Sequence, residues 1–179
     1  MARRNPHDPR EHFRTCYVAN YPKILAYVRR RSDTATSEDL TAEVFARAWR
    51  HWETHTGDDL PWLYGIARNV LLEHYRARDH QTSIIKASAQ QVTDRTPDLT
   101  EAVDTSLSIH AALQRLNESD REILLLHAWE GLDPAEIAQV LDISANNARV
   151  KLHRARTHLD QILSSSTTAS VTTLSPRRG

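Results

Sequence analysis

Residues 133–156, which read DPAEIAQVLDISANNARVKLHRAR, decide the fold of the second half of this 179-residue chain. Asp133 is a good N-cap residue, Pro134 suits the first helical position and Glu136 completes a capping box, so a short helix begins here. A tight turn at Asp142 follows, and Ser144 then caps a second, longer and more basic helix. Two helices separated by so short a turn predict a helix-turn-helix.

The second helix of this motif has two different faces when its residues are placed 100° apart. One face is small and apolar and must pack on the rest of the domain: Ala145, Ala148, Leu152, Ala155 and Leu159. The opposite face is mostly polar: Asn146, Asn147, Val150, Lys151, His153 and Arg154. Amide and guanidinium groups read base edges in the major groove, and Arg149 and Arg156 at the border of the apolar face suit flanking phosphates.

Val150 is the apolar exception on the polar face, and our hypothesis is that it meets a thymine methyl group. The alternative for the whole helix is an amphipathic helix whose polar face is merely solvated. The short capped helix at the right offset favours DNA binding.

Farther from this motif, apolar residues at helical spacing mark two units, separated by a stretch of Gln, Ser, Thr, Ala and Asp in which the spacing fades. The first unit comprises three predicted helices. The fold class is therefore all-α, with two small helical domains joined by a flexible linker. The predicted divisions are a disordered lead over residues 1–10, a first domain over 11–79, a linker over 80–105, the helix-turn-helix domain over 106–163 and a disordered tail over 164–179.

The helix boundaries in the first domain follow from capping and breaking residues. Its first helix is predicted over about residues 11–31, with Pro22 as a kink or a break. Its second helix opens with a capping-box-like stretch at residues 36–39. Pro61, after a polar loop over residues 54–60, suits the first turn of the third helix.

In the second domain, Asn117 is expected to cap one helix and Gly131 to stop it. The last helix is expected to end near Leu163.

The composition excludes several classes of protein. Only four glycines and seven prolines argue against a turn-rich β fold, and no apolar run is long enough to span a membrane. The first residues lack the hydrophobic segment of a secretory signal, so we expect a cytoplasmic protein without membrane insertion. Cys16 is the single cysteine and is expected to be buried. The tryptophans on apolar stripes are expected in the core rather than stacked on bases: Trp49, Trp52 and Trp62.

Enzymatic chemistry has little support in the sequence. His51, Glu53 and His55 form a weak zinc pattern with no strong third ligand nearby, and we expect no metal and no cofactor. No nucleophile–base pair and no phosphate-binding glycine loop is recognisable, so the chain is not expected to be an enzyme. The alternative function among enzymes is a metal-dependent hydrolase built around the histidines.

Three ordered motifs resemble the extracytoplasmic-function (ECF) group of the sigma-70 family. The segment EDLTAEVF at residues 38–45, followed by Arg47-Ala48-Trp49, is similar to the family's polymerase-binding helix. PWLYGIARN at residues 61–69 is similar to the start of its −10 promoter helix, and residues 116–156 are similar to the domain that binds the −35 element. The match extends over roughly residues 13–163.

This resemblance implies a sigma factor, which binds core RNA polymerase and directs it to promoters. It implies contacts with the β′ clamp helices and the β flap, with promoter DNA, and with an anti-sigma factor. The residues implied in polymerase binding are Asp39, Leu40, Glu43 and Arg47. At the −10 element, the residues implied to hold an unstacked base are Asn69 and the loop over residues 54–60, with Thr56, Gly57 and Asp58. The alternative for Asn69 is a helix-surface amide with no special role. The residues implied to contact the nearby backbone are Arg68, His74, Arg76 and Arg78. Those implied at the −35 element are Ser144, Asn146, Asn147, Arg149, Val150, Lys151, His153 and Arg154.

The recognition helix departs from the family pattern. The family often has Gly-Thr-Val where this chain has Asn146-Asn147-Ala148, so base preferences do not carry over. The family often has Gly in the turn where Asp142 stands, and Asp tolerates the left-handed conformation that such a turn requires. A helix-turn-helix regulator that acts without polymerase is the alternative function.

Overall fold

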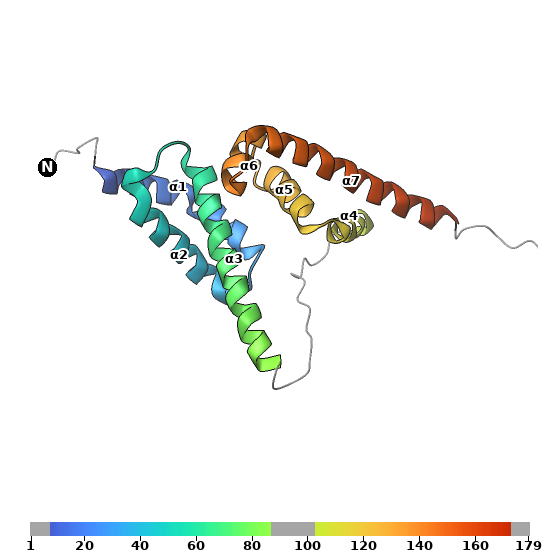
Figure 1. The fold of residues 1–179 in the computed structure, drawn as a ribbon, viewed down its shortest axis with the longest axis horizontal. Helices are drawn as coiled ribbons and strands as arrows, with labels where there is room; N and C mark the ends of the chain where they lie inside the picture. The colour runs from blue at the N-terminus through green and yellow to red at the C-terminus, as the bar shows by residue number, and fades with distance from the viewer. Residues whose placement is uncertain (1–7, 87–102, 173–179) are drawn as a thin grey trace, which may run out of the picture. The chain divides into compact units, whose positions relative to one another are not determined.

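The computed structural model describes residues 8–86 and 103–172, and all regular structure in these two ranges is helical. The chain divides into two compact units, which confirms the all-α class with two helical domains. The first unit contains α1 (Pro9–Arg29), α2 (Thr34–His51), the 3₁₀ turn η1 (Trp52–Thr54) and α3 (Asp59–Lys86) (Figure 1). The second contains α4 (Val103–Arg115), α5 (Glu118–Ala128), α6 (Pro134–Leu141) and α7 (Ala145–Thr172).

In the first unit, α2 begins earlier than predicted, and the proline expected to kink or break α1 does not end that helix. The side chain of Asp33 caps α2 by accepting a hydrogen bond from the Thr36 amide at 3.0 Å, so α2 begins before the expected start at residues 36–39. The Thr36 hydroxyl donates to Asp33 at 2.8 Å instead of capping the helix itself. Pro22 lies inside α1 without breaking it. Its missing amide leaves only the Val18 carbonyl without its helical partner, on a side of α1 where both residues are exposed.

The core of the first unit lies where its three helices pack on one another. Fully buried side chains include Ile24 and Val28 of α1, Val44 of α2 and Leu63 of α3. Burying these apolar side chains provides the main drive for packing the unit. Cys16 is also buried, as expected.

An aromatic cluster joins α1 to α2. Phe13 meets Trp49 and Trp52 edge-on, with ring centroids 5.0 and 5.1 Å apart, and Tyr17 meets Phe45 at 4.7 Å. Edge-to-face contacts of this kind stabilise aromatic pairs. Trp52 is buried as predicted, whereas Trp49 is 43% exposed. The core prediction for Trp49 is wrong because one side of its ring faces solvent while the other packs on Phe13.

The predicted caps of the second unit are confirmed. The Asn117 side chain accepts from the Asp120 amide at 2.8 Å. Asp133 accepts from the Ala135 and Glu136 amides at 2.7 and 2.9 Å, and Glu136 accepts in return from the Asp133 amide at 2.7 Å. These reciprocal bonds satisfy donors that the first turn of a helix leaves unpaired.

The turn between α6 and α7 is left-handed at Asp142, with φ 53° and ψ 51°. The Ile143 amide donates to the Ala138 carbonyl at 3.0 Å, the bond expected for a Schellman ending. Ser144 then caps α7 by accepting from the Asn147 amide at 3.2 Å. Aspartate thus takes the place that glycine fills most easily, as the sequence predicted.

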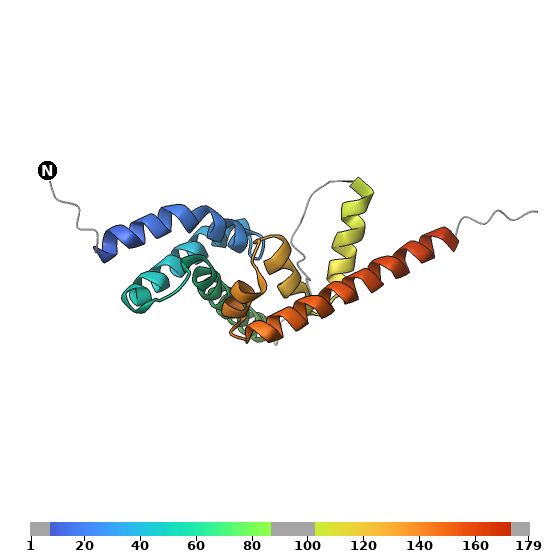
Figure 2. The same cartoon turned by 90° about the horizontal axis from the view of Figure 1, so that it is seen from above.

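α7 packs against α4, α5 and α6 in the second unit. Its buried residues Ala148, Leu152 and Ala155 lie on one face and meet a core that includes Ile123 and Ile137. The small alanines let α7 approach the other helices closely. Figure 2 shows that the C-terminal part of α7 extends past α5 and α6.

Four helices extend into segments predicted to be irregular. α3 continues to Lys86, α4 begins at Val103 and α7 continues to Thr172, beyond the predicted ends near residues 79, 106 and 163. α1 likewise begins at Pro9, inside the predicted disordered lead, with Asp8 as its cap. Polar composition alone does not end a helix when no proline or glycine interrupts it, and none lies between residues 164 and 175. Residues 1–7, 87–102 and 173–179, the rest of the predicted lead, linker and tail, lie outside the described ranges.

Candidate functional site

The outer face of α2 carries the four residues that the sequence assigned to polymerase binding. Asp39, Glu43 and Arg47 follow one another at four-residue spacing and therefore share one side of the helix. Asp39 is exposed, and Leu40 and Glu43 are half-buried. This face presents carboxylates to solvent beside an apolar side chain.

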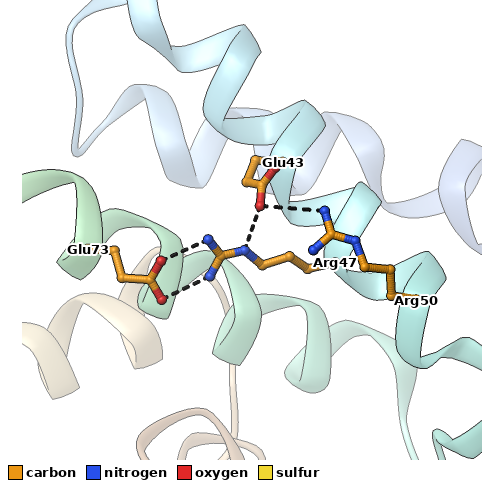
Figure 3. Close-up of polar contacts among 4 residues, drawn as sticks. All are labelled: Glu43, Arg47, Arg50 and Glu73. Atoms are coloured by element: carbon orange, nitrogen blue, oxygen red, sulfur yellow. Dashed lines mark hydrogen bonds and ion pairs between the residues drawn. The ribbon is translucent and has the colours of Figure 1, made fainter.

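Whereas Asp39 is exposed to solvent, the Arg47 guanidinium is bound to other side chains of the protein. Its Nε donates to Glu43 Oε1 at 2.7 Å, and its two terminal nitrogens donate to the carboxylate of Glu73 on α3 at 2.9 and 2.8 Å (Figure 3). Arg50 Nη2 lies 4.0 Å from the same Glu43 oxygen. The hydrogen bond from Arg47 holds the pKa of the Glu73 carboxyl below its ordinary value of 4.5. Arg47 therefore links α2 to α3 through a two-pronged ion pair.

A pocket of about 410 Å³ lies on the first unit between α2 and α3. Three of the residues assigned to the −10 element line it, Arg68, Asn69 and Arg76, all from α3. The full lining is Arg47, His51, Ile66, Arg68, Asn69, Leu72, Glu73 and Arg76. Three arginines against one glutamate make the pocket electropositive, and Ile66 and Leu72 add an apolar surface. Such a lining suits a group that is anionic at one end and flat or apolar at the other.

The other five −10 candidates do not line this pocket. Thr56, Gly57 and Asp58 lie exposed in the loop before α3, where Gly57 has a φ of 104°. Arg78 Nη1 lies 3.3 Å from Asp33 Oδ2, and His74 is half-buried. The structure therefore divides the candidates into a loop, a pocket and the C-terminal part of α3.

The −35 candidates lie together at the start and along the outer face of α7. Val150 is 40% exposed, and Asn146, Asn147, Arg149, His153 and Arg154 are exposed as well. Lys151 is half-buried and its Nζ donates to Ser119 Oγ at 3.3 Å. Asn146, His153 and Arg154 lie opposite the buried face of the helix, as a groove-reading helix requires, and Arg149 lies at its border.

Arg156 does not have the free position predicted for it. Its Nη2 lies 2.6 Å from His127 Nε2, and His127 Nδ1 lies 2.8 Å from the Leu132 carbonyl oxygen. Because a guanidinium can only donate, Nε2 accepts and Nδ1 carries the proton that it donates to Leu132. Arg156 is thereby engaged with α5.

The histidines of the weak zinc pattern do not gather. His55 stacks on Trp62 with ring centroids 3.9 Å apart, and its Nε2 lies 3.2 Å from Asp59 Oδ1. Across the described ranges, no group of three histidine, cysteine, aspartate or glutamate side chains is placed to hold a metal ion. Nor is any helix in those ranges both long and apolar enough to cross a membrane.

Sequence reasoning missed Glu73, Asp33 and Arg121. Arg121 donates to the carbonyls of Leu113, Gln114 and Leu116 at 2.8 to 3.0 Å and so closes the C-terminal end of α4. Only the spacing of Glu73, four residues after Asn69 and three before Arg76, signals that it shares their side of α3.

Two family models match the chain, one described as Sigma-70 region 2 over residues 16–81 and the other as Sigma-70, region 4 over residues 106–159. Together they cover two thirds of the chain, and each falls within one structural unit. The chain belongs to the sigma-70 family. As a sigma factor it belongs to a family of transcription initiation factors, and the matches support this function rather than that of a stand-alone helix-turn-helix regulator.

Curated relatives place this sigma factor in the ECF group. It is 28% identical over 143 residues to RNA polymerase sigma factor SigZ of Bacillus subtilis, covering 78% of this chain and 80% of SigZ. It is 29% identical over 133 residues to ECF RNA polymerase sigma factor SigL of Mycobacterium tuberculosis, covering 72% of this chain and 75% of SigL.

Solved structures share the fold of this sigma factor. One is the sigma factor RpoE from Bartonella quintana, solved with the anti-sigma factor NepR, with a TM-score of 0.63 at 20% identity. The alignment covers 86% of this chain and 98% of that chain. CnrH, solved with the cytosolic domain of CnrY, matches with a TM-score of 0.58 at 20% identity, over 87% and 90% of the two chains.

Proposed function

We propose that this sigma factor uses three separate surfaces to bring core RNA polymerase to a bipartite promoter and to help open it. The surfaces are the outer face of α2, the pocket between α2 and α3 together with the loop that precedes α3, and the outer face of α7. The proposal depends chiefly on one observation: the chain combines a carboxylate-bearing helix, an electropositive pocket and a helix-turn-helix within two matched sigma-70 regions.

The α2 face is proposed to dock on the β′ clamp helices. Asp39 and Glu43 offer negative charge, and half-buried Leu40 lies to one side of them on the same part of the helix. Charge complementarity of this kind sets orientation and speeds association. Arg47 is less suited to this role because its guanidinium is bound to Glu43 and Glu73.

At the −10 element, Asn69 is proposed to hold a base that has left the stack. Capturing an unstacked base offsets the cost of opening the duplex. The pocket volume of about 410 Å³ lies in the range of ordinary ligand sites. Arg68 and Arg76 at its rim would bind the backbone phosphates, and Thr56, Gly57 and Asp58 would contact the same strand from the loop. His74 and Arg78 would contact the backbone farther along α3.

At the −35 element, α7 is proposed to enter the major groove with its N-terminal residues first. Asn146 and Asn147 can each offer a donor and an acceptor to a base edge. Arg149 and Arg154 would hold phosphates, and Ser144 combines its capping role with a contact to the backbone. Lys151 and His153 complete this surface, and Val150 would meet a thymine methyl group. The β flap of the polymerase is proposed to hold the second unit.

Regulation is proposed to come from an anti-sigma factor. A protein with the same fold, RpoE, is described in complex with the anti-sigma factor NepR, and another, CnrH, in complex with the cytosolic domain of CnrY. We propose further that the protein acts in the cytoplasm, where core polymerase is, and that it catalyses no reaction of its own.

The test is binding to core polymerase that lacks sigma factor, taken from a closely related bacterium. Wild-type protein is expected to co-elute with core on size exclusion. The variant Asp39→Arg is expected to lose co-elution, while Glu53→Arg, an equal charge reversal on η1, is expected to keep it. Folded wild-type protein that fails to co-elute would exclude the polymerase-binding function.

A further inference from the structure

Each of the three guanidinium nitrogens of Arg47 donates to a carboxylate of the protein itself. Nε donates to Glu43, and the two terminal nitrogens form a bidentate pair with Glu73, 26 residues away on the next helix. The fork of an arginine matches a carboxylate in this geometry, which fixes the orientation of both groups. Two terminal N–H groups are left over, but these three bonds fix the guanidinium toward Glu43 and Glu73.

Glu73 occupies a position where a negative charge opposes DNA binding. It lines the α2–α3 pocket, one turn after Asn69 and one turn before Arg76. Its side chain is 54% exposed, so its charge faces the space that a DNA strand would enter. Two negative charges repel each other, so an unpaired Glu73 carboxylate would disfavour a DNA phosphate in the pocket.

Arg47 cancels this charge and also fixes the helix that carries it. Both carboxylate oxygens of Glu73 accept from Arg47, and Figure 3 shows the two side chains meeting between α2 and α3. The hydrogen bond from Arg47 lowers the pKa of Glu73, so the pair favours the ionised form of this carboxylate. The pair of Arg47 and Glu73 therefore reduces the negative charge in the pocket and also fixes the position of α3 against α2.

We propose that Arg47 is a positioning residue for promoter opening, which neutralises Glu73 so that the pocket between α2 and α3 can accept an anionic single strand. This inference rests on the proposed −10 function of the pocket. It replaces the sequence-based assignment of Arg47 to polymerase binding. It also assigns a role to Glu73, which no motif identified.

The test separates a role in neutralising charge from a role in stability. Arg47→Met removes the cation but keeps most of the apolar stem, and leaves Glu73 unpaired. Arg47→Met combined with Glu73→Gln removes both charges. Arg29→Met is the matched control, because it breaks another exposed ion pair of the same unit, with Glu38 at 3.1 Å. Each variant is assembled into holoenzyme, and three quantities are measured: affinity for core, permanganate reactivity of −10 thymines, and the free energy of unfolding.

We expect Arg47→Met to keep its affinity for core and to open the promoter about fivefold less well, the upper range for one exposed charge interaction. The double variant is expected to recover opening to within about twofold of wild type, although the ion pair is still absent. Arg29→Met is expected to open the promoter normally.

Four results would overturn the inference. Loss of core affinity in Arg47→Met would make Arg47 a polymerase contact. Failure of Glu73→Gln to restore opening would make the pair a purely structural link, and an equal defect in Arg29→Met would show a general effect of losing a surface ion pair. Normal promoter opening by Arg47→Met would show that Arg47 has no role in opening. A separate result would be wild-type protein that binds core polymerase but forms a holoenzyme that opens no promoter. This would contradict the proposed −10 function itself and the inference with it.

Discussion

Val150 gives the sharpest test of how α7 reads DNA. It is 40% exposed in the free protein, on a face whose other residues are polar or charged. If it meets a thymine methyl group, DNA binding removes the remaining exposed apolar surface from water. Val150→Ala should therefore weaken promoter binding without weakening the fold.

The magnitude follows from the exposure. Val150→Ala removes two methyl groups, which contribute about 0.8 kcal/mol each when fully buried, and 40% of their sum is about 0.6 kcal/mol. This corresponds to a loss of about threefold in affinity. The free energy of unfolding should change by no more than about 0.5 kcal/mol, as at other surface positions.

The assay begins with selection of bound sequences by holoenzyme from a promoter library randomised at the −35 element. Wild-type protein should enrich thymine at one position, and Val150→Ala should lose that preference. Ile109→Ala is the matched control, since Ile109 is 44% exposed in the same unit but lies on α4. An unchanged −35 preference in Val150→Ala, with affinity equal to wild type, would refute the thymine contact.

Three further results are expected from the capping box, the ion pair and the cysteine. Asp133→Ala should lower the stability of the second unit by about 1 kcal/mol in urea unfolding, and Asp133→Ser, which keeps an acceptor, should lower it less; equal losses would contradict the capping role. Because its folded pKa is lowered, Glu73 stabilises the protein above pH 4.5, and this contribution disappears as the pH falls through the folded pKa. Glu73→Gln should thus be less stable than wild type at pH 7, by about 1 kcal/mol at most, and equal to it in acid; a difference that persists in acid would count against this. Burial raises the pKa of Cys16 from 9.0 to about 11, so at pH 8 its thiolate fraction should be about 100-fold lower than normal, and reaction with a thiol reagent correspondingly slow in the native protein. A reaction rate of Cys16 in the native protein close to its rate in urea would contradict this burial.

Features that depend on neighbouring residues were predictable from the sequence. The caps at Asn117, Asp133 and Ser144 and the left-handed turn at Asp142 all involve groups a few residues apart. Their bonds form whenever the local helix forms, so residue type and spacing are sufficient to find them. The two faces of α7 were predictable for the same reason.

Features that depend on packing between helices were not predictable. Arg47 and Glu73 are 26 residues apart, and no helical period relates them. Their pairing depends on how α2 and α3 are rotated against each other. Sequence periodicity shows which face of each helix is buried, but it does not show which polar residues meet at the edge of the contact. The same applies to Trp49, whose stripe indicated burial although only one side of its ring is covered.

The choice of Asp33 over Thr36 as the cap of α2 shows a different limit. Both residues are of a capping type, and each could begin a helix at its own position. In the structure the Thr36 side chain donates to Asp33, so one candidate became the partner of the other. Residue type narrows the start of a helix to a few positions without deciding between them.

The local caps of the second unit also bear on how quickly it can fold. α5, α6 and α7 follow one another directly, and their ends are fixed by side chains within a few residues. Few long loops must therefore close before native contacts form, and helical domains with such short-range contacts fold in microseconds to milliseconds. The DNA-reading surface should be complete almost as soon as this part of the chain has been synthesised. The rate at which DNA-binding protein becomes available is therefore set by translation rather than by folding.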